Sequence, residues 1–370
     1  MVCSPSAAQL HGLVARQHIL DAIANHSRGV DRADAHLLGA AYHGDATVDY
    51  GFFEGPAAQL VEILADAQKG ALPTLHRTCH SALAVAGRHA LAESYVIACV
   101  DGGDVQRLVL GRYLDRLEER EGSWRIAKRT YVLDANCNRA GANPRLDPPL
   151  AYDHFTPVGG KGAGDAGRVL LAHHFAATHS ARKAAAMPSA SPASDAPLPA
   201  AAALDAALSR DAIRQLVATY CRGVDRADAE LLASIFWPDS SVISGVVNGS
   251  GPEFAEGIIA FITAHLDSCF HSVANEWIEV TGDHGVGEHY VIAHMRMAGN
   301  EVLTGGRYID RYERRAGIWK IAARSFVADW TQTQPSSHED AGFYEALKNR
   351  GAFGRHDPVY AHWAALDPVA

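Results

Sequence analysis

Apolar residues recur at helical and then at strand spacing in the second half of the chain. LSRDAIRQLVATYCRGV (208–224) predicts a helix with Ser209 as its N-cap. The second aspartate of the next segment, DRADAELLASIF, can cap a short helix, and FAEGIIAFITAHL predicts a third. Four segments of strand character follow: HSVANEWIEV, GEHYVIAHMRM, EVLTGGRYIDRYERR and WKIAARSFVADW. This order predicts an α+β unit in which a curved antiparallel sheet wraps around helices.

The same series of segments occurs in the first half of the chain. The stretch 28–34 (RGVDRAD) recurs as 222–228, and 76–134 pairs without a gap with 271–329. GRYLDR pairs with GRYIDR, and SWRIAKR pairs with IWKIAAR. Each copy is followed by an Arg-x-Asp-Pro tail, RLDP and RHDP. A repeat of this length predicts two domains of one fold.

The predicted fold class is therefore α+β, with two fused cone-shaped domains. We expect the first domain over 10–157 and the second, with a C-terminal tail, over 206–370. Residues 158–205 are rich in Gly, Ala, Ser and Pro, which predicts a linker, although GRVLLAHHFAATHSARKAAAM within it could form a helix. A curved sheet closed by helices encloses a cavity of the kind that binds small molecules.

Composition narrows the classes of function. With 48% hydrophobic and 20% charged residues, the chain resembles a soluble globular protein, and no apolar run is long enough to span a bilayer. A net charge of -9 without a basic stretch argues against a nucleic-acid partner. No secretory signal is visible, and the six cysteines form no C-x-x-C pair. We therefore expect a cytoplasmic protein with reduced thiols, without disulfides or a cysteine zinc site.

One aspartate in each copy lies where its negative charge needs a compensating partner. Asp225 ends the first predicted helix of its copy, where the helix dipole disfavours a carboxylate. It could pair with Arg222 or Arg226 at the surface. Alternatively, it could orient a histidine, because His271 recurs along with it in the repeat.

In the first copy the matching residues are Asp31 and His76. A carboxylate bound to one imidazole nitrogen fixes the tautomer and leaves the other nitrogen free as a general base. Descent from one ancestor would give the same recurrence, so the repeat supports this dyad without proving it.

Other residues are candidates for substrate contact. Asn275 is four residues beyond His271, hence on the same face of a strand, and His80 takes its place in the first copy. Tyr220 ends the first helix, where the first copy has His26. Recurring arginines on the late strands could neutralise a leaving group or lie at a solvated edge: Arg112, Arg307, Arg129 and Arg324.

No cofactor or metal is expected. On a strand, His76 and His80 lie too far apart to share one zinc ion. No phosphate-binding loop and no dinucleotide fingerprint is present.

These segments together resemble a known family. The RGVDRAD helix end, the segment FWPDSSV, the H-x-x-x-N strand and the GRYIDRYERRAGIWKIAAR hairpin are similar to the SnoaL-like branch of the nuclear transport factor 2-like superfamily. The resemblance covers roughly 10–135 and 208–332 and implies a cone of curved sheet with a deep apolar pocket. Members with this Asp and His are similar to scytalone dehydratase, hexachlorocyclohexane dehydrochlorinase and bile-acid dehydratases. In those enzymes a His-Asp dyad removes a proton while water or halide leaves.

The resemblance implies a cofactor-independent lyase acting on a mostly apolar, hydroxylated small molecule. His271 and His76 would be the bases, and Asp225 and Asp31 would orient them. Dehydratase-type elimination and deformylating carbon–carbon cleavage of an aromatic compound, such as a lignin-derived diarylpropane, both stay open, and both fit aromatic compound catabolism.

Other functions also stay open. The chain could be a non-catalytic binding or scaffold protein, or an isomerase or cyclase of the same fold. In a mixed case the first copy is the degenerate one, because His80 and His26 depart from the second copy. We expect either a homo-oligomer or an internal pseudo-dimer of the two domains.

Overall fold

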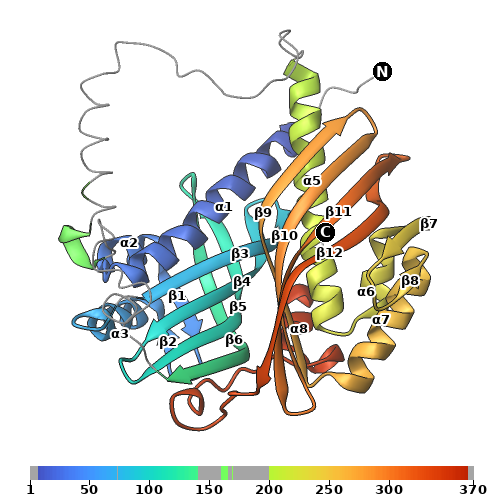
Figure 1. Ribbon diagram of the computed structural model, residues 1–370. Coiled ribbons are helices and arrows are strands. Elements are labelled where there is room, and N and C mark those ends of the chain that lie inside the picture. The colour runs from blue at the N-terminus through green and yellow to red at the C-terminus, as the bar shows by residue number, and fades with distance from the viewer. Residues whose placement is uncertain (1–6, 73, 141–159, 166–168, 170–199, 366–370) are drawn as a thin grey trace.

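Two six-stranded sheets, one in each half of the chain, form the frame of this computed structural model (Figure 1). The structure describes residues 7–72, 74–140, 160–165, 169 and 200–365. The strand order is β2-β1-β6-β5-β4-β3 in the first sheet and β8-β7-β12-β11-β10-β9 in the second. The same order in both halves confirms the repeated α+β fold.

The elements of the two domains correspond one to one. The first domain consists of α1 (Ala7–Asp31), α2 (Ala35–Ala40), β1 (Tyr42–Asp49), β2 (Glu54–Pro56), α3 (Ala57–Gln68), β3 (Thr74–Ala86), β4 (His89–Asp101), β5 (Val105–Arg120) and β6 (Ser123–Ala140). The second consists of α5 (Ala200–Asp225), α6 (Ala229–Ser234), β7 (Phe236–Ile243), β8 (Asn248–Gly249), α7 (Gly251–His265), β9 (Ser268–Thr281), β10 (His284–Met297), β11 (Asn300–Arg315) and β12 (Ile318–Pro335). A short helix, η2 (Gly162–Gly164), lies between the domains in sequence, and η3 (Gly342–Tyr344), η4 (Gly354–His356) and α8 (Pro358–Ala364) follow the second.

Most of the predicted helix ends agree with the structure. Asp34 and Asp228 cap α2 and α6, accepting hydrogen bonds from backbone amides at 3.1 and 2.9 Å. The prediction that Ser209 caps the first helix of the second copy is wrong, because α5 already begins at Ala200. Alanine has the highest helix propensity, and the run AAAALDAAL extends the helix in the N-terminal direction. The expected linker helix and the boundary near residue 157 lie outside the described residues.

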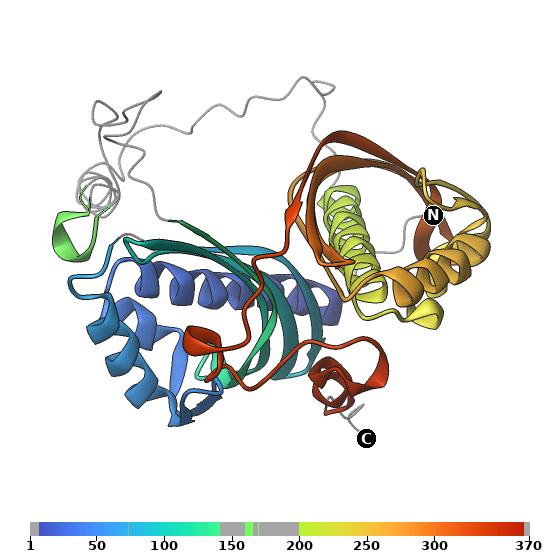
Figure 2. The ribbon, with the colours of Figure 1, turned by 60° about the horizontal axis from the view of Figure 1, so that its bottom comes forward.

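The long first helix of each domain lies across the concave face of its sheet (Figure 2). In the first domain Ile19 and Ile23 of α1 are buried in the core, and in the second Ile213 and Val217 of α5 take these places. These helices end beside β3 and β9, and this places Asp31 and Asp225 at the sheets. None of the helices in the described ranges has the length and apolar composition that crossing a bilayer requires.

The two domains contact each other asymmetrically. The outer face of the first sheet packs against β9 and the end of α5, whereas the equivalent face of the second sheet is open in the described structure. Tyr95 of β4 is therefore 1% exposed, but its counterpart Tyr290 of β10 is 49% exposed. The contact joins one face of the first sheet to β9 and α5 of the second domain and does not follow a two-fold arrangement.

Buried charges hold this contact. Arg112 of β5 donates to Asp134, Glu93 and Asp357 at 2.7–3.1 Å, and all four side chains are nearly inaccessible to solvent. Arg226, directly after α5, donates to Asp134 and Asp357 at 2.9 Å. Asp134 and Asp357 thus each bind one arginine from each domain.

The C-terminal segment crosses from the second domain to the first, and its last helix, α8, packs against the first sheet near the junction of the two domains (Figure 2). Tyr344 and Leu347 are buried in the core of the first domain. Leu133 of β6 exchanges backbone hydrogen bonds with Asn349 and Gly351. The segment therefore closes the open end of the first cone.

Candidate active site

Asp225 and His271 form a hydrogen-bonded pair in the second domain. The His271 Nδ1 atom lies 2.6 Å from Asp225 Oδ1, and the His271 backbone amide donates to Oδ2 at 2.8 Å. Because a carboxylate accepts only, Nδ1 carries the proton and Nε2 has the free lone pair. The arrangement provides a general base with a fixed ring orientation.

The first domain repeats this geometry. The His76 Nδ1 atom lies 2.7 Å from Asp31 Oδ1, and the His76 amide donates to Oδ2 at 2.8 Å. Thr74 also donates to Asp31 at 3.1 Å. Cys269 takes the threonine's place in the second copy, with its Sγ 3.5 Å from His271 Nδ1.

The electrostatic setting explains how Asp225 remains charged at the end of a helix. Burial alone would raise its pKa, but the charge and hydrogen bonds of His271, with Arg226 nearby, bring the pKa below its ordinary value. Asp225 is fully buried, so the alternative of a surface pair with Arg222 or Arg226 does not describe it.

A cavity of about 300 Å³ lies beside the second pair. Its wall is mostly apolar, with polar groups at only a few positions: Tyr220, Val224, Ser244, Val246, Phe254, Ile258, Phe261, Ile262, Leu266, Cys269, His271, Ala293, Met295, Thr304, Tyr308, Phe326, Ala328 and Thr331. His271 therefore meets a space that can hold a small apolar ligand.

Larger side chains stand at two matching positions of the wall in the first domain. Tyr50 stands where the second copy has Ser244, and it stacks on Tyr131 at 5.6 Å between ring centroids. Leu133, 1% exposed, stands where the second copy has Ala328. His26 lies among these rings and binds the hydroxyls of Tyr42 and Tyr50 at 3.0 and 3.2 Å.

Of the other expected site residues, Tyr220 lines the cavity and two are placed elsewhere. Asn275 is exposed, because a β-bulge opposite Tyr290 interrupts the alternation that would have put it on the face of His271. His80 lies at the domain contact, where its Nδ1 atom accepts from the Val273 amide at 3.4 Å. Its ring packs on Tyr95.

The four arginines form ion pairs, and none of them lines the cavity. Arg112 belongs to the buried domain contact, whereas its counterpart Arg307 is partly exposed and binds Glu288 and Asp329 at 2.9 Å. Arg129 and Arg324 form two-pronged pairs, and each lies against tyrosine rings. Their carboxylate partners are Asp115 and Asp310 respectively.

Arg324 contacts the site indirectly. Its guanidinium lies 4.1 and 4.3 Å from the ring centroids of Tyr220 and Tyr308, two residues of the cavity wall. Burial raises the pKa of Tyr220 to about 12, so its hydroxyl stays protonated and can donate a hydrogen bond. Arg324 therefore packs behind two tyrosines of the cavity wall but does not itself line the cavity.

Sequence reasoning did not find the residues that shape the cavity. The apolar ones, such as Phe261 and Met295, look like ordinary core positions in a helix and a strand. Pairing the copies position by position carries a usable signal, because Ser244 against Tyr50 and Ala328 against Leu133 show a small residue opposite a large one.

One group at the dyad has donor atoms close enough to hold a metal ion. Asp225, Cys269 and His271 lie within ligand distance of one another. The short Asp225–His271 hydrogen bond already uses His271 Nδ1, and burial raises the pKa of the Cys269 thiol. The geometry therefore fits a protonated imidazole nitrogen better than a metal-bound one.

Comparison with known proteins shows which family of domains each copy of the repeat matches. The SnoaL-like domain family matches residues 12–130 and residues 205–325, one match in each half. The gamma-hexachlorocyclohexane dehydrochlorinase of Sphingobium indicum is 29% identical over 132 residues, 34% of this chain and 85% of that protein. Hexachlorocyclohexane dehydrochlorinase 1 of the same species is 28% identical over 127 residues, 32% of this chain and 80% of that protein.

Two solved structures that are similar to this chain also match about a third of it. The crystal structure of LinA is 27% identical, covers 34% of this chain and 89% of its own, and has a TM-score of 0.33. A putative scytalone dehydratase from Novosphingobium aromaticivorans is 18% identical, covers 36% of this chain and 95% of its own, and has a TM-score of 0.32.

Proposed function

The chain belongs to the SnoaL-like domain family, and from this membership we propose that its second domain is a cofactor-independent lyase. The observation that carries the proposal is His271, held by Asp225 and lining a mostly apolar cavity. The likeness to dehydrochlorinases, which eliminate HCl, supports elimination as the type of reaction.

In the proposed step, His271 Nε2 takes a proton from a substrate carbon. The C–H electron pair becomes the second bond of an alkene, and the leaving group departs from the neighbouring carbon with its own bonding pair. Asp225 stabilises the imidazolium that forms, because its carboxylate already binds Nδ1. The step needs no oxidant and no cofactor.

The cavity wall favours a small, mostly apolar substrate. Hydroxyls of Tyr220, Thr304 and Thr331 lie on the wall, and they can donate hydrogen bonds to a departing hydroxide or chloride. A volume of about 300 Å³ is at the small end of ligand pockets. We therefore propose a compound of one or two rings with a hydroxyl or halogen beside an acidic C–H bond.

The first domain serves a structural role in this proposal. Its dyad has the same geometry, but Tyr50 and Leu133 occupy the space beside it, and the C-terminal segment closes the cone. His76 then helps Asp31 to attach α1 to β3. This supports one competent pocket in each chain.

Activity measurements on paired variants test the proposal. The full chain is incubated without cofactor with chlorinated cyclohexanes and with hydroxylated aromatics, and mass spectrometry detects loss of HCl, water or formaldehyde. Loss of formaldehyde would place the same base in carbon–carbon cleavage. We expect His271→Ala to lower the rate by roughly 10² to 10⁴, and His76→Ala to leave it near that of the native chain. Full activity in His271→Ala, or its loss in His76→Ala, would contradict the proposal.

A further inference from the structure

A second group of reactive side chains lies where the two domains meet. Cys137 comes from β6 of the first domain, and His294 and Glu301 come from β10 and β11 of the second. All three are at least nine-tenths buried, at 5%, 1% and 3% exposure. They lie outside the dyad and its cavity wall, so the proposed reaction does not use them.

The donor atoms of this group have the spacing of one coordination shell. Cys137 Sγ lies 3.2 Å from His294 Nε2, which in turn lies 3.6 Å from Glu301 Oε2, and all three atoms are within 4.8 Å of one another. Tetrahedral zinc with bonds of about 2.0–2.3 Å places its ligands about 3.3–3.7 Å apart. A modest adjustment of these side chains would let all three bind one ion.

Glu301 presents one oxygen to the group and uses the other for support. Ser337 donates to Oε1 at 3.1 Å, and Gln334 donates to the same atom. Oε2, by contrast, is buried, and within the described residues no donor has good hydrogen-bond geometry to it, His294 Nε2 being 3.6 Å away. An unpaired buried carboxylate oxygen is costly, and a cation would satisfy it. Hydrogen bonds to the other oxygen are typical of residues that orient a metal ligand.

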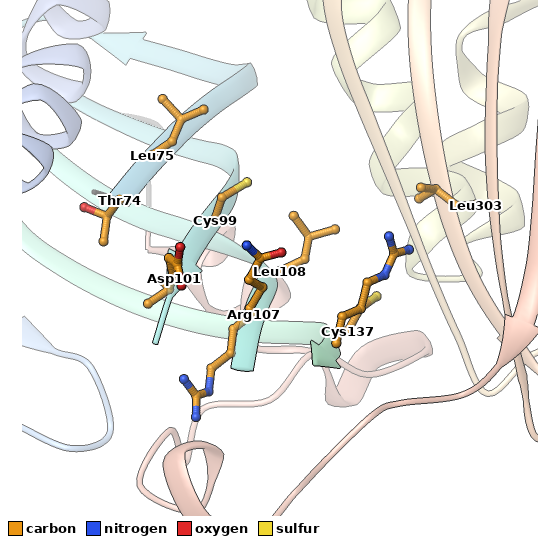
Figure 3. A pocket seen from close by; sticks show the side chains of 11 residues that line it. Thr74, Leu75, Cys99, Asp101, Arg107, Leu108, Cys137 and Leu303 are labelled. Carbon is orange, nitrogen blue, oxygen red and sulfur yellow. The ribbon is translucent and has the colours of Figure 1, made fainter. Parts of the chain in front are cut away.

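We propose that Cys137, His294 and Glu301 bind one Zn²⁺ ion that joins the two domains. Cys137 also lines a cavity of about 400 Å³ between the domains (Figure 3), and a water molecule from that cavity would complete a four-coordinate shell. The ion has a structural role in this proposal, which is independent of the activity of the second domain. The sequence did not predict it because the ligands come from different halves and have no motif spacing.

Metal analysis of the untagged full chain tests the site. We expect about one zinc ion per chain after purification with Zn²⁺ and gel filtration, and a higher melting temperature with Zn²⁺ than with EDTA. Replacement by Co²⁺ should give thiolate-to-cobalt charge-transfer absorption. Absence of stoichiometric metal and of this absorption would overturn the proposal.

Matched variants locate the ion. Cys137→Ser and Glu301→Gln keep the shape of the cluster, and each should lower Zn²⁺ affinity by at least about tenfold, with Cys137→Ser also losing the charge-transfer band. Cys99→Ser, which changes another cysteine of the same cavity, should bind like the native chain. His271→Gln should also keep its zinc, which separates this site from the second group of candidate ligands. Native affinity in both Cys137→Ser and Glu301→Gln, or zinc loss in His271→Gln, would refute the assignment.

Discussion

Single residues distinguish the two pockets although the dyads match. In both copies an aspartate accepts from a histidine ring and from the same histidine's backbone amide, so this contact attaches a helix to a strand whether or not chemistry follows. The difference lies in the residues beside it, since buried Tyr50 and Leu133 in the first domain stand where the second has Ser244 and Ala328.

This difference predicts the result of exchanging the residues. The double variant Ser244→Tyr/Ala328→Leu should fold, because the first domain accommodates the same side chains at these positions, but it should lose ligand binding and turnover. Leu133→Ala in the first domain is the control: it should lower the free energy of unfolding by about 2–5 kcal/mol and leave turnover unchanged. Calorimetry and the mass-spectrometric assay measure both. Unchanged turnover in the double variant would mean that the reaction occurs elsewhere.

Much of the site could be predicted at this scale, but not all. The pairing of Asp225 with His271 followed from the repeat, since both residues recur together. The position of Asn275 did not, because a β-bulge depends on strand pairing that no local pattern reveals. His80 was misplaced for a similar reason: a packed domain contact determines where its ring lies.

At the scale of elements, the C-terminal segment has the largest effect on the first domain. Tyr344 of η3 is fully buried, and its hydroxyl donates to Asn138 at 2.8 Å. Gly51 has φ +77°, and an added Cβ there would lie 2.4 Å from the Lys348 amide. The segment therefore fits closely over the cone.

Two adjacent aromatic residues test this closure. Tyr344→Ala should lower the free energy of unfolding by about 3–5 kcal/mol, because it removes a buried ring from the first core. Phe343→Ala, at a neighbouring residue that is 53% exposed, should have little effect. Urea unfolding of the full chain compares them, and equal losses of stability would argue against closure by the segment.

Elements were predictable where periodicity is strong. The long strands and the Asp-capped helices agree with the pattern. Strands β1 and β7 were missed, because they are short and carry polar residues, as in FWPDSSV, and they form by pairing in parallel with β6 and β12. Tertiary pairing outweighs local propensity in such segments.

For the whole molecule, the charge cluster at the domain contact links stability to pH. Burial would raise the pKa of Asp357, but Arg112 and Arg226 bring it well below its ordinary value. A carboxylate with a depressed pKa in the folded state stabilises the fold above its unfolded pKa of about 4, and this contribution is lost as the pH falls further.

Asp357→Asn should therefore matter most at neutral pH. We expect it to lower the free energy of unfolding by about 3 kcal/mol at pH 7, with the difference from the native chain shrinking as the pH falls below about 4. Asp329→Asn, which removes an exposed partner of Arg307, is the control and should change stability little. Unfolding curves between pH 3 and pH 7 measure both. A difference that grows on acidification would contradict the assigned role of Asp357.

The two-domain plan could be predicted because the repeat is long, but the arrangement of the domains could not. Burial of Arg112 and exposure of Arg307 depend on which face meets the partner. The two copies carry nearly the same residues on these faces, so a single sequence does not distinguish them.

The asymmetric contact has a consequence for how the two copies evolve. In a symmetric homodimer every inherited substitution appears on both sides of the interface, so each change alters the interface at two places. Here a substitution in one copy appears once, against a partner that is a different segment of the same gene. Tyr95 and Tyr290 occupy matching positions of the repeat, but one is buried at the domain contact and the other is exposed. Fusion into one chain therefore allows the two halves to diverge independently, as the proposed single competent pocket requires.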